Sequence, residues 1–139
     1  MTCSRRDLTF LLPALAAAGA RAEKALPSKT YRFEDLPVRV NGQNRSRAVL
    51  KGANRTGFPI ELHQTELGPG EAPHLPHHHA HEEIVFIREG TLEVTIEGRA
   101  STLGPGSVAY VASNEEHGWR NTGASRAHYF VMALGRDQS

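Results

Sequence analysis

The sequence predicts an all-β domain built from antiparallel strands. Short segments with strand character recur from Phe58 onward, Gly, Pro or Asn turns separate them, and no helical period is sustained. Strands spaced about 8 to 12 residues apart with such turns are typical of β-sandwiches and barrels. No segment remains for crossover helices, so the strands should be antiparallel. The predicted strand segments are residues 58–67, 82–90, 90–98, 104–112, 117–121 and 127–134.

Residues 1–22 have the layout of a secretory signal peptide. Arg5 and Arg6 precede an apolar run from Leu8 to Ala18, and small residues end the stretch at Ala22. The run contains a proline and is too short for a helix that spans a bilayer of roughly 30 Å. We therefore expect cleavage after Ala22, a periplasmic or secreted protein, and no membrane segment in the mature chain.

The same stretch, "SRRDLTFLL", also resembles the twin-arginine export signal, although Leu8 stands where that family most often has Phe. The alternative is an ordinary secretion signal whose basic end contains two arginines. The resemblance implies that the protein folds in the cytoplasm before export.

The mature chain would run from Glu23 to Ser139 and would contain no cysteine, because Cys3 lies in the signal. It therefore has no disulfide, although its compartment would permit one. Without the signal, 13 basic and 14 acidic residues remain of the original 16 and 15. This balance gives no reason to expect a nucleic-acid partner.

Two parts of the mature chain are expected, an N-terminal arm over residues 23–57 and a β-barrel domain over residues 58–139. The arm is polar and interrupted by proline, which predicts edge strands and loops. In the barrel, "EIVFI" is apolar on both faces, with Ile84 and Phe86 on one and Val85 and Ile87 on the other. Either the arm or a second subunit should cover the outer face, and we expect a homodimer.

The stretch "HLPHHHAHEE", residues 74–83, holds five of the eight histidines. His77 and His79 are two positions apart, which in an extended chain places both imidazoles on one face with Cα atoms about 6.6 Å apart. Both can then reach one metal through bonds of about 2.0 to 2.1 Å. In a straight strand Glu83 would lie roughly 20 Å from His77, so a bend is expected at residues 80–82. His117 is the best remaining candidate for a fourth ligand.

The spacing of these residues resembles the two sequence motifs of the cupin superfamily. His77, His79 and Glu83 form HxHxxxE, six residues and Gly90 follow, and Gly106, His117 and Asn121 lie downstream. The resemblance covers about residues 70–121 and implies an antiparallel double-stranded β-helix, the jelly-roll barrel. It also implies that the metal ligands are His77, His79, Glu83 and His117. Ser107 and Ala112 replace the family's usual Asp and Pro, and neither position is a ligand.

One divalent transition metal is the predicted cofactor, and Mn, Fe, Ni, Cu and Zn are all compatible with these ligands. With open positions, such an ion suits a metal-dependent enzyme acting on a small oxygen-rich molecule. A dioxygenase is the first choice, and an isomerase, lyase or hydrolase are the others. The base could be Glu82, His81 or metal-bound hydroxide. The alternative is a non-catalytic periplasmic binder of a metal or small ligand. A loose histidine tract for zinc or nickel would leave the spacing to Glu83 and His117 unexplained.

Three further residues are predicted to line the pocket. Trp119 and Asn121 share the face of His117 in residues 117–121, although Trp119 could instead be a core residue without ligand contact. His63 is the third, with an outward orientation as the alternative. His78 should point to solvent, and His74 and His81 should be surface or neighbouring groups rather than ligands.

Overall fold

The computed structural model describes residues 24–136, and the predicted signal over residues 1–22 lies outside this range. The described chain is an antiparallel β-structure with one short 3-10 helix, and no helix in it is long and apolar enough to cross a membrane. Its elements are η1 (Phe33–Asp35), β1 (Val38–Asn41), β2 (Asn44–Ala53), β3 (Pro59–Leu67), β4 (Glu82–Glu89), β5 (Leu92–Ile96), β6 (Arg99–Leu103), β7 (Val108–Val111), β8 (His117–Asn121) and β9 (Ala127–Leu134).

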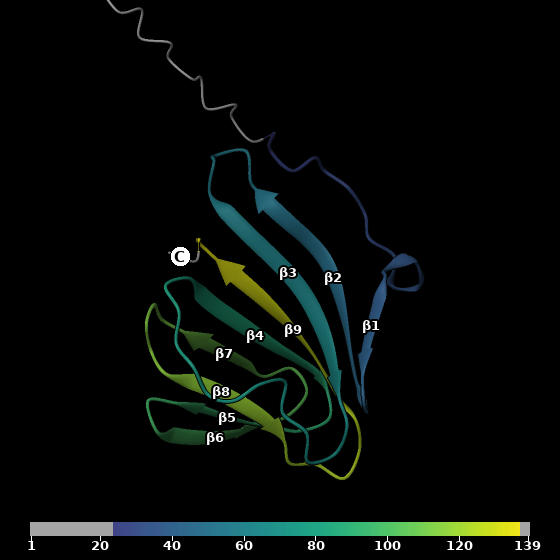
Figure 1. The fold of residues 1–139 in the computed structure, drawn as a ribbon, viewed down its shortest axis with the longest axis vertical. Helices are drawn as coiled ribbons and strands as arrows, with labels where there is room; N and C mark the ends of the chain where they lie inside the picture. The colour runs from purple at the N-terminus through teal and green to yellow at the C-terminus, as the bar shows by residue number, and fades with distance from the viewer. Residues whose placement is uncertain (1–23, 137–139) are drawn as a thin grey trace, which may run out of the picture.

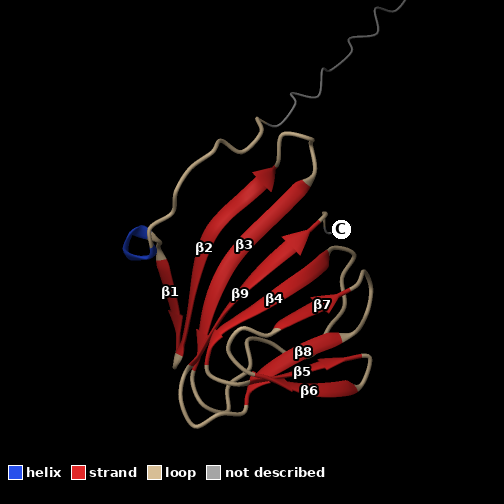
Figure 2. Cartoon of the chain, turned by 180° about the vertical axis from the view of Figure 1, so that it is seen from behind, coloured by secondary structure: helices blue, strands red, loops and turns tan. Residues whose placement is uncertain are grey.

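The strands form two sheets, which confirms the predicted jelly-roll. The larger sheet has the order β1-β2-β3-β9-β4-β7, and the smaller one has the order β6-β5-β8. Figure 1 and Figure 2 show the strands of the larger sheet fanning out from one end, with the smaller sheet beside β4 and β7. All paired strands in both sheets are antiparallel.

Two strands differ from the sequence-based expectation. The arm contributes the edge strand β1, but β2 is an inner strand paired with both β1 and β3. The strand β6 was not predicted. It pairs with β5 through a two-residue turn at Glu97 and Gly98, which have φ angles of 47° and 73°. Because β6 is mostly exposed, it lacks the apolar alternation that marks a half-buried strand.

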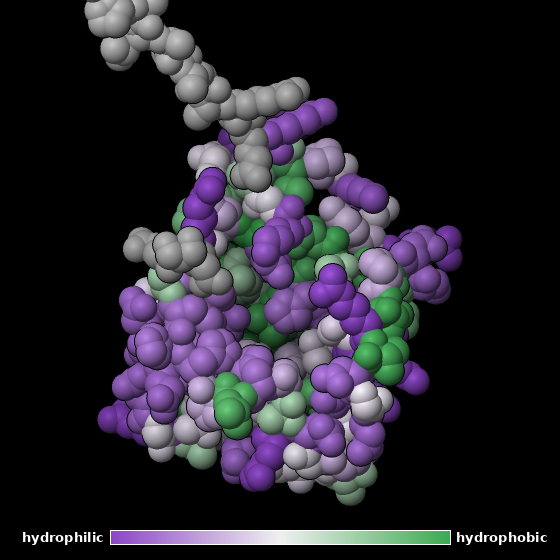
Figure 3. Space-filling view, in the orientation of Figure 1, coloured by the Kyte–Doolittle hydropathy of each residue, from purple (hydrophilic) through white to green (hydrophobic). Residues whose placement is uncertain are grey.

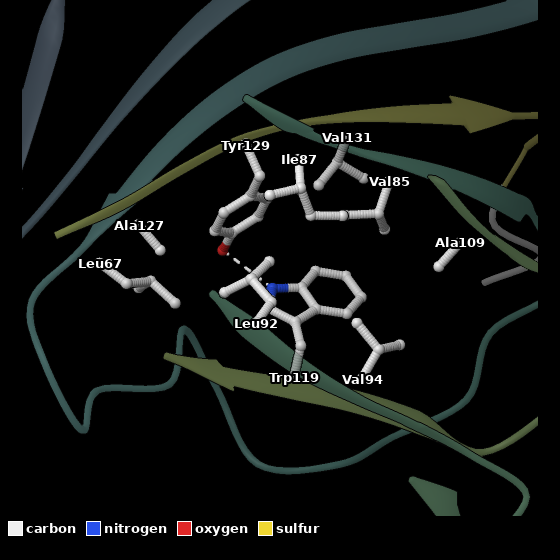
Figure 4. Packing of buried hydrophobic residues seen from close by; sticks show 10 residues of the cluster. All are labelled: Leu67, Val85, Ile87, Leu92, Val94, Ala109, Trp119, Ala127, Tyr129 and Val131. Carbon is white, nitrogen blue, oxygen red and sulfur yellow. Dashed lines mark hydrogen bonds between the residues drawn. The ribbon is translucent and has the colours of Figure 1, made fainter. Parts of the chain in front are cut away.

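The hydrophobic core lies between the two sheets. Figure 4 shows the side chains of β4 and β9 meeting those of β5 and β8. The Trp119 indole Nε1–H donates to the Tyr129 hydroxyl at 2.9 Å, so the largest aromatic group of the core buries no unpaired polar atom. The core cluster consists of Leu67, Val85, Ile87, Leu92, Val94, Ala109, Trp119, Ala127, Tyr129 and Val131.

The two faces of β4 have different surroundings. Val85 and Ile87 are buried in the core, whereas Phe86 on the outer face is 41% exposed. The arm does not cover this outer face. Its Phe33 ring instead contacts the Arg47 guanidinium, 4.3 Å from the ring centroid, and lies 6.1 Å from the His128 ring. In the arm, Phe33 thus lies against two polar residues of the larger sheet, Arg47 on β2 and His128 on β9.

Candidate metal centre

The histidine segment is attached to β8 by a short piece of antiparallel pairing. The His77 N–H donates to the His117 carbonyl at 3.0 Å, and the His117 N–H donates to the His77 carbonyl at 2.8 Å. Gly118 permits this approach, because a Cβ at this position would lie 3.2 Å from the Cα of Pro76. The chain bends at Ala80 and His81, as predicted, and returns to the site as β4. The pairing and the bend bring His77 and His79 close to His117, and Glu83 close to His79 and His117.

Hydrogen bonds to backbone carbonyls fix the orientation of three imidazoles. The Nδ1 atoms of His77, His79 and His117 lie 3.3, 2.9 and 2.8 Å from the carbonyl oxygens of Leu75, His81 and Glu115. A carbonyl oxygen only accepts, so each Nδ1 must carry the hydrogen and each Nε2 of a neutral ring keeps its lone pair. Metal-binding histidines are held in the same way by partners behind the ring.

The atoms that face one another are acceptors without donors. His79 Nε2, His117 Nε2 and Glu83 Oε2 are buried and make no hydrogen bond. Glu83 Oε2 lies 3.2 Å from His117 Nε2, and Glu83 Oε1 lies 3.5 Å from His79 Nε2. Protonation of one imidazole would satisfy only one of these contacts, whereas one cation would satisfy them together. Buried polar atoms without partners are costly, so a cation bound between these atoms would stabilise this arrangement.

The spacing of these atoms is compatible with one ion. Two ligand atoms at bonds of about 2.1 Å from the same ion lie at most about 4.2 Å apart, and both Glu83 contacts are within this limit. One ligand atom from each of His77, His79 and His117 lies within 4.8 Å of the others. The residues present therefore fit a divalent transition metal, which prefers this mixture of imidazole and carboxylate.

His81 lies beside this set rather than on the surface. Its Nε2 is 3.4 Å from Glu83 Oε1, and its ring stacks on that of His79 at 3.6 Å between centroids. One atom from each of His79, His81 and Glu83 also lies within 4.8 Å of the others. His81 thus contacts the oxygen of Glu83 that does not face His117.

Burial favours the neutral form of three imidazoles in this region, those of His79, His63 and His74. It lowers the pKa of His79, which the hydrogen bond to the His81 carbonyl and the charge of Glu83 oppose. Burial also lowers the pKa of His63 and of His74. The Trp119 ring, part of the hydrophobic core, stacks on that of His117 at 5.9 Å between centroids and an interplanar angle of 24°.

A cavity of about 570 Å³ leads to this centre from the rim of the barrel. Its deep end is lined by Glu83, His81 and His63, and the Glu83 side chain is only 10% exposed. Its outer part is lined by Lys51, which is 80% exposed, and by ends of the neighbouring strands. Figure 3 shows one face of the molecule hollowed, with hydrophobic side chains inside the hollow and hydrophilic side chains around it. The volume suits one small molecule.

The predicted pocket and base residues do not all lie in this cavity. His63 and His81 line it. Trp119 is a core residue hydrogen-bonded to Tyr129, which was the alternative reading of its position. Glu82 does not point inward, because it alternates with the inward Glu83 and hydrogen-bonds Tyr110, a residue 53% exposed. It is therefore not placed to act as the base.

Asn121 is also not a pocket residue. It is fully buried, and its amide donates to the carbonyl oxygens of Leu67, Gly68 and Ser125 at 2.8 to 3.1 Å. Its Oδ1 accepts from the Gly123 N–H at 2.9 Å. These hydrogen bonds connect the end of β3 with the loop between β8 and β9. His78 is exposed, as predicted, and His74 lies against His77 at 4.1 Å between ring centroids.

Three charged residues of the cavity were missed from the sequence. Lys51 and Glu61 are cross-strand partners on β2 and β3, with Lys51 Nζ 2.6 Å from Glu61 Oε2, and Arg136 follows β9. The only sequence signal is that each lies near a strand end. This signal is weak, because most charged residues near strand ends are solvated.

Comparison with known proteins agrees with this architecture. The cupin domain model matches residues 63–133, just over half of the chain. The L-ectoine synthase of Bordetella parapertussis is 36% identical over 74 residues, which is 52% of this chain and 54% of that protein, and the synthase of Bordetella avium is 35% identical over the same length. The chain thus spans about half the length of the curated relatives it matches.

Solved structures show the same fold. An RmlC-like cupin from Shewanella frigidimarina has a TM-score of 0.66 at 15% identity, covering 83% of this chain and 95% of that one. The polyketide cyclase RemF from Streptomyces resistomycificus has a TM-score of 0.65 at 18% identity, covering 81% and 83%. With the matched domain, the fold and the motif residues gathered at one centre, this chain belongs to the cupin family.

Proposed function

We propose that the protein is a metal-dependent cupin enzyme that acts on a small oxygen-rich molecule. One divalent transition metal, Mn, Fe, Ni, Cu or Zn, is held by His77, His79, Glu83 and His117. The observation that carries this proposal is the set of buried acceptor atoms on His79, Glu83 and His117 that face one another without a donor. The names of the matched relatives, L-ectoine synthases, support an enzyme rather than a passive binder.

The residues around the centre have distinct roles in this proposal. When bound, the ion supplies Lewis-acid chemistry or, for a redox-active metal, oxygen chemistry. The backbone carbonyls behind the three imidazoles hold the rings in one tautomer and one orientation. His81 contacts Glu83 Oε1 and leaves Oε2 directed toward His117, so it positions the carboxylate. It also lines the cavity and is the remaining side-chain candidate for the base.

The size of the cavity limits the substrate. At about 570 Å³ it accommodates one small molecule rather than a polymer chain. His63 lines it near Glu83, and burial keeps its imidazole neutral by lowering its pKa. A neutral imidazole offers one donor and one acceptor to an oxygen-rich ligand.

Glu83→Gln tests the metal centre. We expect metal content in protein purified from its natural compartment to fall strongly and any turnover to vanish, because the anionic ligand is lost while the shape is kept. Glu93→Gln on β5, at the surface beside Arg120, is the matched control and should keep wild-type metal content. Stoichiometric metal in Glu83→Gln, measured by elemental analysis, would remove Glu83 from the ligand set.

Screens on the wild-type protein then assign the reaction class. Oxygen consumption with a small substrate would support the dioxygenase class, and turnover without oxygen would support an isomerase, a lyase or a hydrolase. Retention of metal or ligand without turnover in any screen would favour the non-catalytic binder instead.

We also propose that the mature protein is an exported homodimer. The outer faces of β4 and β7 carry Phe86, Val108 and Tyr110, which are 41, 52 and 53% exposed and lie on paired strands. An apolar face of this kind is suited to a two-fold interface between identical copies. Light scattering should give a dimer for the wild-type chain and a monomer for Phe86→Asp. A periplasmic location that is lost on Arg5→Lys/Arg6→Lys would support the twin-arginine route.

A further inference from the structure

The strand β3 presents an imidazole to the cavity at the candidate metal centre. Thr65 and Leu67 of this strand face the barrel interior, since Thr65 hydrogen-bonds to Tyr129 of the core and Leu67 is itself a core residue. Alternation along the strand places His63 on the same face. Its cross-strand partner Val131 is also a core residue, and His63 lines the cavity. The His63 side chain therefore points into the cavity and not to the outer face of the sheet.

The His63 imidazole has no hydrogen-bond partner among residues 24–136. Within this range, the fully enclosed side-chain atoms that lack a partner are those of the metal centre. The His63 nitrogens are not among them, so they are accessible from the cavity that the residue lines. Glu61, the neighbouring inward residue on β3, is already paired with Lys51 at 2.6 Å. His63 thus keeps its hydrogen-bonding capacity for a ligand.

Ala133 lies between His63 and the metal centre. On β9, it pairs with Glu83 of β4 on one side and with Glu61 of β3 on the other, and it lines the cavity. Its methyl group leaves the space above β9 open to a ligand. The strands β3 and β4 are two strand spacings apart, or about 9.6 Å. A metal bond of about 2.1 Å and a hydrogen bond of about 2.9 Å leave about 4.6 Å of this span for the ligand itself. Two oxygens at the ends of an extended three-carbon chain are separated by roughly this distance.

We propose that His63 binds the substrate opposite the metal centre and selects a small molecule with two oxygen functions at the ends of a three-carbon chain. One oxygen meets the centre, and the other, a hydroxyl or a carbonyl, hydrogen-bonds to His63. The inference rests on the proposed function, because the first oxygen needs a bound ion. A neutral imidazole suits an uncharged second group, since one of its nitrogens donates and the other accepts. Burial favours this neutral form by lowering the pKa of His63.

A pair of probes that differ only in the second oxygen tests this assignment. The full chain, loaded in parallel with Mn²⁺ or Zn²⁺, is titrated with 3-hydroxypropionate and with butyrate, in which a methyl group replaces the hydroxyl, and binding is followed by calorimetry. We expect the wild type to bind 3-hydroxypropionate about three- to tenfold more tightly, which is the range for one hydrogen bond.

Variants of His63 assign this preference to its imidazole. His63→Leu should abolish the preference and leave butyrate binding unchanged, because leucine fills the position without a hydrogen-bonding group. His63→Gln keeps a donor and an acceptor and should retain part of the preference, which distinguishes loss of the hydrogen bond from a structural effect. His78→Leu is the matched control, since His78 is exposed and does not line this cavity, and it should keep the wild-type preference.

Three results would overturn the role of His63. They are equal binding of the two probes by the metal-loaded wild type, no binding of either probe, and a preference that survives in His63→Leu. Metal content is measured on the same samples. A wild-type chain that retains its ion but shows no preference contradicts the role of His63 alone, whereas a chain that retains neither ion contradicts the metal centre, so the two failures are distinguishable.

Discussion

The two halves of the barrel interior differ in how they satisfy the polar groups they bury. In the packed half, the Trp119 indole bonds to Tyr129 and the Asn121 amide makes bonds at both its ends. In the open half, His79, Glu83 and His117 place acceptor atoms opposite one another with no donor between them. The packed half pairs its buried polar groups within the protein, whereas in the open half a bound cation would satisfy the acceptor atoms. Stability should therefore come from the first half, and metal binding from the second.

The largest effect is expected from a cavity in the packed half. Leu92→Ala removes a fully buried side chain from the core cluster and should lower the free energy of unfolding by about 2 to 5 kcal/mol. Urea unfolding of the metal-free chain measures this loss. The metal affinity of the folded fraction should stay at the wild-type value. A parallel loss of affinity would mean that the two halves are coupled.

Asn121→Ala separates a structural from a pocket role for this residue. It removes the donor for three backbone carbonyls and the acceptor for the Gly123 N–H, and unsatisfied buried groups cost about 1 to 3 kcal/mol. We expect lower thermal stability and unchanged metal affinity. If binding of metal or substrate probes falls while the melting temperature is unchanged, Asn121 belongs to the pocket after all.

Glu83→Gln should affect stability in opposite directions with and without metal. Without metal, the new amide can donate to the lone pair of His117 Nε2, which lies 3.2 Å from a Glu83 oxygen, so the variant should be at least as stable as the wild type. With metal, the wild type should be the more stable protein, because only it binds the ion tightly. Thermal unfolding with and without a chelator checks both signs. If the variant were less stable than the wild type in chelator, the contact between the Glu83 carboxylate and the His117 Nε2 lone pair would not destabilise the metal-free wild type.

The smallest expected effect is on the pH dependence of stability. Burial lowers the pKa of His63 below its ordinary value of 6.5, so the unfolded chain takes up this proton at a higher pH than the folded chain does. Stability from the neutral ring is therefore complete above about pH 6.5 and is lost as the pH falls below it. His63→Gln should flatten this part of the stability curve in chelator, and His78→Gln, at an exposed position, should not. A curve unchanged by His63→Gln would exclude this contribution.

Much of this division between the two halves could be predicted from the sequence. The alternation of Leu92 and Val94 and the turns between strands predicted the antiparallel barrel, because one face of each strand had to be buried. The HxHxxxE spacing and the need for a bend predicted that Glu83 would return to His77 and His79. Neither β6 nor the inner position of β2 was predicted, because exposed or charged strands carry no such alternation.

The roles of individual residues near the site were harder to predict. Alternation in residues 117–121 placed His117, Trp119 and Asn121 on one face, and this is where the structure has them. The face, however, runs from the metal centre through the core to the packed end, so only His117 reaches the site. Glu82 was a candidate base by proximity to Glu83, but neighbours in a strand point to opposite faces.

By itself, the sequence determined most of the strand pattern and the candidate ligand residues of this cupin, because both depend on spacing along the chain. Only the tertiary structure decided which face of the barrel each polar side chain meets, and whether its partner is a carbonyl, a carboxylate or a cavity. It alone placed Arg136 and Lys51, from distant strands, around one opening. Such groups come together through strand pairing over long sequence separations, which local periodicity does not record.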